Sequence, residues 1–397
     1  MSARLMGGVI AFGIAVCMAA LAGLPAMAQQ NPVIQPGMRI VFLGSAASIP
    51  GESTVLVPSP NGGWVNQRTG QTYNLEDNPG GGGAGYVALD IIEVTPQHII
   101  GFSNNWLLYD LQTGATTHIE GHGFIDSGEN IADFWVEPRK LAAIGDVQSQ
   151  TQIIRRMPYP LGGQTYSAIR MQLYSNGGWT QNTYDTVTGL LLVATSNIAG
   201  KGTQVLGPDN TIQPGAGTTS ITYSQIMNVR KTNLPGPGMR LPANFLNLRK
   251  LVYAGQYGFN LRGAEMQTPG LPMQIEVTIT GSAPTHISAM LTERSAAALG
   301  ISVPIQLIAG GIGGFYLDPT YLASLRQGVV LDEDQVLKTR TFVASVDNTM
   351  VMLTVQSPFT AVTYGYDRQS GMLVYNDSRT DTGLGPQYRT VQLQSVQ

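Results

Sequence analysis

One six-residue pattern occurs twice in this chain, as Asp133-Phe134-Trp135-Val136-Glu137-Pro138 and as Gly314-Phe315-Tyr316-Leu317-Asp318-Pro319. Both versions contain an aromatic pair, a branched aliphatic residue, an acid and a proline in the same order. Because an acidic side chain can cap a helix and proline fits the first helical turn, each version predicts a short helix directly after it. The pattern therefore indicates an internal repeat.

A second pattern follows the first by about fifty residues in both halves. It reads Tyr184-Asp185-Thr186-Val187-Thr188-Gly189-Leu190-Leu191 in the first half and Tyr366-Asp367-Arg368-Gln369-Ser370-Gly371-Met372-Leu373 in the second. The aspartate can accept hydrogen bonds from amides two or three residues on, and the glycine can adopt the positive φ that closes a bulged turn. We expect the same β-hairpin in both halves.

Two fainter matches precede these patterns: Ile40–Gly44 resembles Leu251–Gly255, and Pro96–Ile99 resembles Pro284–Ile287. All four landmarks keep the same order, which predicts a tandem duplication. The expected fold is mainly β, with two tandem, diverged copies of an antiparallel β-sheet unit, each a sandwich or half-barrel with a short helix. A β-propeller is the alternative, but the turn glycines at 70, 114, 189 and 371 lack the even spacing of its blades.

Composition divides the chain into five parts. We predict a signal peptide over residues 1–28, a first β-rich domain over 29–198, a Gly/Pro-rich linker over 199–242, a second β-rich domain over 243–378 and a loose polar tail over 379–397.

The signal peptide has the order of segments that export requires. Arg4 provides a positive charge, Gly7–Leu24 is apolar, and Ala26-Met27-Ala28 places small residues at the cleavage site before Gln29. A retained membrane anchor or a lipoprotein at Cys17 are the alternatives, which the cleavage site and the branched residue before Cys17 disfavour. We expect a periplasmic or secreted protein without thiols, because Cys17 is the only cysteine.

Composition also limits the partners. The whole chain has 22 basic and 25 acidic residues, and removal of Arg4 leaves 21 basic residues and a net charge of −4. Without a basic stripe, nucleic acid is not expected as a partner. Beyond the signal peptide no run of about 18 apolar residues occurs, so we expect no transmembrane helix after cleavage.

Few residues suggest chemistry, and no catalytic residue is identified. His118, His122 and Asp126 are a candidate site for a divalent metal, the only cofactor considered, although a solvated loop explains them as well. Asp126-Ser127-Gly128 and Asp381-Thr382-Gly383 resemble the paired motifs of aspartic proteases. They fall at non-equivalent places in the inferred repeat, which favours coincidence.

Two further groups have competing interpretations. Asp332-Glu333-Asp334 could contribute to a calcium site, but a loop between helix and strand would expose these charges anyway. The four tryptophans could line a sugar- or lipid-binding face, with Trp135 more plausible in the core: Trp64, Trp106, Trp135 and Trp179.

Sparse charge, the absence of catalytic motifs and a repeated β scaffold favour a non-catalytic exported protein of the periplasm or cell envelope. It would bind a partner protein or an apolar or glycan ligand. The alternative is a hydrolase of the cell envelope or of its polymers, possibly metal-dependent, with residues 118–133 at its centre.

Overall fold

The structure is a computed structural model of the whole chain. It describes residues 34–50, 56–58, 64–66, 72–73, 82–110, 115–175, 178–200, 204–206, 212–214, 218–259, 270–295, 298–382 and 385–397. The predicted signal peptide at residues 1–28, with Cys17, lies outside the described residues.

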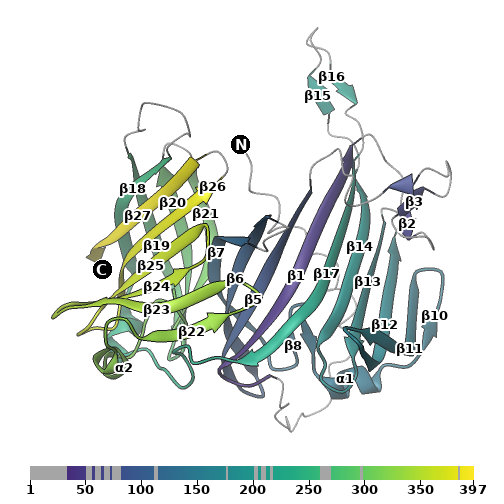
Figure 1. Cartoon of the computed structure of the whole chain (residues 1–397), viewed down its shortest axis with the longest axis horizontal. Helices are drawn as coiled ribbons and strands as arrows, with labels where there is room; N and C mark the ends of the chain where they lie inside the picture. Colours follow the sequence, from purple (N-terminus) through teal and green to yellow (C-terminus); the bar gives the residue numbers. More distant parts are fainter. Residues whose placement is uncertain are drawn as a thin grey trace. The chain divides into compact units, whose positions relative to one another are not determined.

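The protein is mainly β and antiparallel, as the sequence predicted (Figure 1). Most of its described strands form one large antiparallel sheet, and the others form small separate sheets. Two short α-helices accompany them, α1 (Pro138–Ala143) and α2 (Pro319–Ser324). Within the described ranges, no helix has the length and hydropathy needed to cross a membrane.

The chain divides into two compact units. Unit 1 comprises Met1–Pro32, Phe42–Ala84 and Asp126–Ile226, and unit 2 comprises Val33–Val41, Gly85–Ile125 and Met227–Gln397. Four strands contribute residues to both units: β1 (Met38–Pro50), β5 (Gly82–Val94), β7 (Ala115–Ser127) and β17 (Thr218–Lys231). These limits differ from the predicted domains, since residues 85–125 of the predicted first domain belong to unit 2.

The other strands of unit 1 include an antiparallel series from β10 to β14 in chain order. They are β2 (Leu56–Pro58), β3 (Trp64–Asn66), β4 (Thr72–Tyr73), β8 (Asn130–Ile131), β9 (Trp135–Val136), β10 (Val147–Gln148), β11 (Gln152–Leu161), β12 (Gln164–Ser175), β13 (Gly178–Asp185), β14 (Leu191–Gly200), β15 (Gln204–Leu206) and β16 (Ile212–Pro214).

The other elements of unit 2 include two antiparallel series, β18 to β21 and β22 to β27, with β27 pairing back to β18. They are β6 (His98–Asp110), the 3₁₀ helix η3 (Ala243–Asn247), β18 (Lys250–Phe259), β19 (Leu271–Ala283), β20 (His286–Ser295), β21 (Ala298–Ile308), β22 (Val330–Asp334), β23 (Thr339–Val346), β24 (Met350–Gln356), β25 (Thr360–Asp367), β26 (Leu373–Thr382) and β27 (Gly385–Val396).

In unit 1 the first sequence pattern forms helix α1, as predicted. The side chain of Glu137 accepts a hydrogen bond from the Lys140 amide at 3.0 Å, and Pro138 occupies the first turn. Leu141 on the helix is fully buried. The cap satisfies an amide that has no partner within the helix, so the acid–proline pair determines where the helix begins.

The second pattern of unit 1 forms the predicted hairpin between β13 and β14. Asp185 accepts hydrogen bonds from the amides of Val187 and Thr188 at 3.2 and 3.1 Å. Gly189 has a φ of +78°, and a Cβ there would lie 2.1 Å from the carbonyl oxygen of Val136. The Gly189 carbonyl accepts from the Val136 amide at 3.0 Å, which joins the hairpin to the first pattern.

Unit 2 contains the corresponding contacts. Asp318 caps α2 by accepting from the Thr320 amide at 2.7 Å. Asp367 accepts from the Ser370 amide at 2.7 Å, and Gly371 has a φ of +76°. The Gly371 carbonyl accepts from the Leu317 amide at 2.9 Å. Each unit therefore builds its helix and hairpin with bonds of the same kind at matching positions.

A buried tyrosine completes the helix–hairpin contact in each unit. The Tyr184 hydroxyl donates to the carbonyl oxygen of Asp133 at 3.0 Å, and the Tyr366 hydroxyl donates to that of Gly314 at 3.1 Å. Both tyrosines are buried. A buried hydroxyl requires a partner, so these bonds hold each first pattern against its hairpin.

Two segments outside the predicted β-rich domains contain strands. The predicted loose tail, 379–397, contains strand β27, which pairs with β18 and β26. The predicted linker, 199–242, contains β17, a strand of 14 residues that pairs with β14. Polar composition is compatible with both strands, because alternating polar and apolar side chains suit a strand with one exposed face.

The matched aspartates give the first testable prediction. Asp185→Ala and Asp367→Ala each leave amides of a tight turn without an acceptor, and each should lower the free energy of unfolding by about 1–2 kcal/mol. Val187→Ala, which shortens a side chain that is 73% exposed in the first turn, should change it by less than about 0.5 kcal/mol. Denaturant unfolding of the mature chain measures all three. An aspartate variant as stable as Val187→Ala would contradict this role of the turn.

Candidate functional site

Unit 2 encloses a small polar cavity. Its lining includes Arg39, Asp90, Trp106, His118 and Tyr364. Its volume, counted as the space open to the centre of a water-sized sphere, is about 20 Å³, which is room for about one water. Charged, aromatic and imidazole groups meet here, which makes the cavity the candidate site of unit 2.

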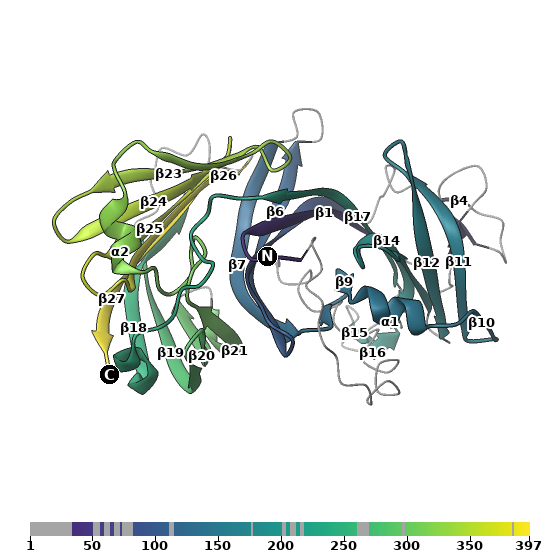
Figure 2. The ribbon, with the colours of Figure 1, turned by 90° about the horizontal axis from the view of Figure 1, so that it is seen from below.

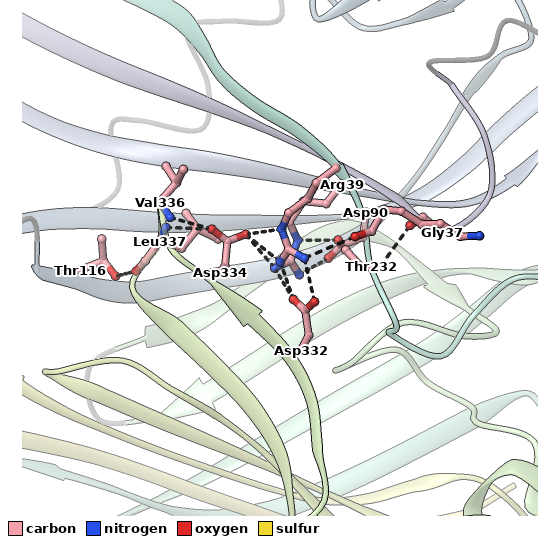
Figure 3. Close-up of polar contacts among 11 residues, drawn as sticks. Gly37, Arg39, Asp90, Thr116, Thr232, Asp332, Asp334, Val336 and Leu337 are labelled. Atoms are coloured by element: carbon pink, nitrogen blue, oxygen red, sulfur yellow. Dashed lines mark hydrogen bonds and ion pairs between the residues drawn. The ribbon is translucent and has the colours of Figure 1, made fainter.

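The guanidinium of Arg39, on β1, lies at the centre of a buried charge network (Figure 3). Nε and Nη2 donate to the two carboxylate oxygens of Asp90, on β5, at 2.7 and 2.9 Å. Nη1 donates to Asp332 and to Asp334, both on β22, at 3.3 Å each. Each of the four side chains is less than 10% exposed. A single arginine therefore links three strands.

A second arginine binds the same two carboxylates of β22. Arg230, on β17, donates to both oxygens of Asp332 at 2.8 and 2.5 Å and to Asp334 at 3.0 Å. These paired contacts suit the planar fork of a guanidinium and resist rotation of either group. The network therefore contains two arginines and three aspartates.

Asp334 also organises the turn that follows β22. Its Oδ1 accepts from the amides of Val336 and Leu337, both at 3.0 Å. The carbonyl of Leu337 accepts from the Thr116 hydroxyl of β7 at 2.6 Å, and the Thr116 carbonyl accepts from the Ser357 hydroxyl at 2.7 Å. The bonds continue the network into the neighbouring strands of unit 2.

The network favours the charged forms of Arg39 and Asp334. Burial alone would lower the pKa of Arg39, but the adjacent carboxylates, Asp90 first, hold it above its ordinary value. Burial alone would raise the pKa of Asp334, but the Leu337 amide and the two arginines hold it below its ordinary value. The arrangement is that of a structural ion cluster in which each buried charge has a partner of opposite sign.

His118, the first predicted metal ligand, lies on β7 against aromatic and amide groups. Its ring packs edge-on against Trp106 with centroids 4.8 Å apart, and its Nε2 lies 3.3 Å from Oδ1 of Asn104. Burial lowers the pKa of His118 to about 4. The imidazole is therefore neutral near pH 7.

The other two predicted ligands lie elsewhere. His122 is exposed on β7, four residues from His118, a separation of about 13 Å along an extended strand. Asp126 belongs to unit 1, where its Oδ2 accepts from the Ala132 amide at 3.0 Å. Across the described ranges, no three His, Cys, Asp or Glu side chains are grouped so that they could hold a metal ion.

Unit 1 contains a pair of carboxyl groups with raised pKa values. Burial raises the pKa of Asp126, and burial together with the charge of Asp126 raises the pKa of Asp133 to about 6. Between them Ala132 has a φ of +38°, a conformation that costs energy for a residue with a Cβ. Acids with raised pKa values at a strained segment are a pattern known from catalytic sites.

Both interpretations of Asp332-Glu333-Asp334 need correction. The segment is strand β22 and not a loop, and its side chains alternate: Asp332 and Asp334 are buried, whereas exposed Glu333 pairs with Arg340. The two buried carboxylates bind arginines and not calcium. The signal missed in the sequence was Arg39 between apolar residues of a strand, because a buried arginine needs buried acids.

The remaining candidates have structural partners or lie partly outside the described residues. Buried Trp135 donates from its indole nitrogen to the carbonyl of Thr188 at 2.9 Å, which supports the predicted core role. Trp106 and Trp179 are also buried. Asp381 and Thr382 end β26, and Gly383 and the side chain of Trp64 lie outside the described residues.

No protein-family model matches this chain, and no curated protein matches it significantly.

The Arg39 network gives a second prediction. Arg39→Met leaves Asp90 buried without its counter-charge and should lower the free energy of unfolding by about 3–5 kcal/mol. Arg340→Met is the matched control, because Arg340 and Glu333 are both more than half exposed, and it should cost less than about 1 kcal/mol. Denaturant unfolding followed by circular dichroism compares them. Equal losses in the two variants would contradict a structural role of the network.

Asp133 gives a third prediction, with a defined pH dependence. Its folded-state pKa of about 6 exceeds the ordinary 3.8, so its contribution to stability is present below pH 4 and is lost as the pH rises through 6. Asp133→Asn removes the buried charge and should raise the free energy of unfolding by about 1 kcal/mol at pH 8, with no gain near pH 4. The control substitution Glu333→Gln, at an exposed side chain, should leave the free energy of unfolding unchanged at pH 4 and at pH 8. A gain for Asp133→Asn that is equal at both would contradict the raised pKa.

Proposed function

We propose that this chain is an exported, non-catalytic protein of the periplasm or cell envelope that binds a partner protein or an apolar or glycan ligand. Export is supported by the first 28 residues, with Arg4, the apolar run Gly7–Leu24 and the Ala26-Met27-Ala28 site. The mature protein would begin at Gln29 and would lack cysteine.

The observation that carries the non-catalytic proposal is the pairing of charges in unit 2. A catalytic acid or base must reach a proton on the substrate. Asp90, Asp332 and Asp334 instead bind Arg39 and Arg230, and each is less than 10% exposed. These groups stabilise strands.

Among the possible ligands, the geometry favours a partner protein. Small-molecule sites usually enclose about 300–1,000 Å³, and the cavity beside Arg39 offers about 20 Å³ to the centre of a water-sized sphere. A protein partner needs no cavity, because it contacts an extended surface. A mainly antiparallel sheet provides such surfaces on its exposed faces.

We also infer that the mature chain arose by tandem duplication. In support, the contacts of Glu137, Asp185 and Gly189 recur at Asp318, Asp367 and Gly371. Ala132, with its positive φ of +38°, corresponds to Gly313 at +87°, where glycine adopts this conformation without cost. Without duplication, the helix cap, the tyrosine contact and the turn would each have had to arise twice, in the same order.

A second candidate function remains, because one observation favours it. Asp126 and Asp133, at the end of the segment 118–133, have raised pKa values. A carboxyl group with a pKa near 6 can serve as a general acid at neutral pH. The hydrolase proposal therefore rests on Asp126 and Asp133 and not on His118 and His122.

One set of experiments compares the two proposals. The chain would carry a C-terminal tag in its own host, where we expect it outside the cytoplasm with Gln29 at its N-terminus. Lysine-reactive crosslinking in intact cells should recover one recurrent protein partner, which should then bind the purified mature chain. Recovery from the cytoplasm with Met1 retained would contradict export.

The hydrolase alternative is tested on insoluble envelope polymer from the same host. Wild-type protein and the Asp133→Asn variant should both leave it intact, and the variant should bind the partner with unchanged affinity. Release of soluble fragments by wild type but not by Asp133→Asn would overturn the non-catalytic proposal.

A further inference from the structure

Strand β11 in unit 1 has one side that is largely without a neighbouring strand. It pairs with β12 along all of Gln152–Leu161, but β10 covers only Ile153 and Ile154 on the other side. Beyond them, within the described part of the chain, no strand pairs with that side. Such an edge usually presents free amides and carbonyls to which another chain can add a strand.

The hydrogen bonds show which residues face this edge. The Tyr174 amide donates to the Thr151 carbonyl, and residues pair across β11 and β12 without a shift. Backbone groups alternate between the two sides of an antiparallel strand. Odd-numbered residues of β11 therefore bond to β12, and the even-numbered residues from Gln152 to Pro160 face the edge.

None of these five residues offers a free amide. The Gln152 amide donates to Oγ of Ser149 at 3.0 Å, and Ile154 pairs with Val147 of β10. The Arg156 amide donates to a carboxylate oxygen of Asp146 at 3.3 Å. The last two are Pro158 and Pro160, which have no N–H.

Both prolines lie at positions of β11 whose backbone groups do not bond to β12. At an odd-numbered position, proline would remove a bond of the β11–β12 ladder; at 158 and 160 it removes only the outward donor. The hairpin closes through Gly162 and Gly163, with φ of +59° and +80°, which suits a two-residue turn. The hairpin is drawn in Figure 2 with its turn away from α1.

Helix α1 is attached to the same edge. The guanidinium of Arg156 donates to three carbonyl oxygens at the end of α1: those of Leu141 at 2.8 Å, Ala142 at 3.1 Å and Ile144 at 3.0 Å. The Leu141 carbonyl also accepts from the Ile144 amide at 3.3 Å. The arginine adds a donor to all three carbonyls at the end of the helix and so holds α1 beside β11.

We propose that Asp146, Pro158 and Pro160 close the β11 edge against addition of the same strand from a second copy of this chain. A copy is the occupant that the geometry must exclude, because two identical antiparallel edges can pair about a twofold axis with every contact made twice. A chain that left most of this strand as an open edge would self-associate through it. This inference concerns unit 1 alone and does not depend on the proposed function.

The test restores the missing donors. Pro158→Thr combined with Pro160→Thr returns two outward amides in each copy, and the dissociation constant for self-association should fall at least about tenfold relative to wild type. Light scattering on the mature chain over a concentration series measures it. Hydrogen exchange of the β11 amides should then show protection at 158 and 160 that increases with concentration.

The control changes the cross-strand neighbours of the same prolines. Ser167→Thr with Thr165→Val raises strand propensity on β12 but adds no donor to the β11 edge. It should associate as wild type does. Asp146→Ala, which frees the Arg156 amide and keeps both prolines, provides a variant of smaller effect if the double threonine variant does not fold. A folded double threonine or Asp146→Ala variant that associates no more than the control would overturn the proposal.

Discussion

The buried guanidinium of Arg39 is the constraint on which unit 2 depends. An arginine cannot shed its charge in a protein, so burial is tolerated only when carboxylates surround it. Its partners Asp90, Asp332 and Asp334 lie 51 to 295 residues away in the sequence. The pairing therefore brings β1, β5 and β22 together, and it stabilises β22 on the side where β23 offers no hydrogen bonds.

Local features of the fold were predictable because their physical causes are local. A capping acid, a proline and a left-handed glycine act within a few residues, so the helices at Pro138 and Pro319 and the hairpins at Asp185 and Asp367 follow from the sequence. The Arg39 network was not predictable in this way. The residues near Arg39 in the sequence do not indicate which acids bind it, because these acids lie more than fifty residues away.

In the candidate site, too, closeness in the sequence does not determine which side chains meet. His118 and His122 were placed near each other because they are close in sequence, but an extended strand separates residues that a helix would bring together. Composition alone also does not show whether a polar segment forms a strand. The chain from Thr218 to Lys231 and from Gly385 to Val396 is polar on one face, which a composition count reads as linker or tail although the strands pair along their length.

Units 1 and 2 share a helix and hairpin with similar contacts but differ at the strand that follows the helix. In unit 2 this strand, β22, is held by buried ion pairs with Arg39 and Arg230. In unit 1 its counterpart β10 is two residues long and exposed, and the next strand carries Pro158 and Pro160 at its edge. The strand edges of the two units are therefore satisfied by different chemistry.

The most direct measurement of the central claim is hydrogen exchange at the amides of Val336 and Leu337 in the mature protein. Both donate to the Asp334 carboxylate that the arginines hold in place. We expect both amides to exchange as slowly as the amides of β24 in the same unit. Exchange at the rate of an unprotected loop, with β24 still protected, would contradict the claim that the Arg39 network fastens β22.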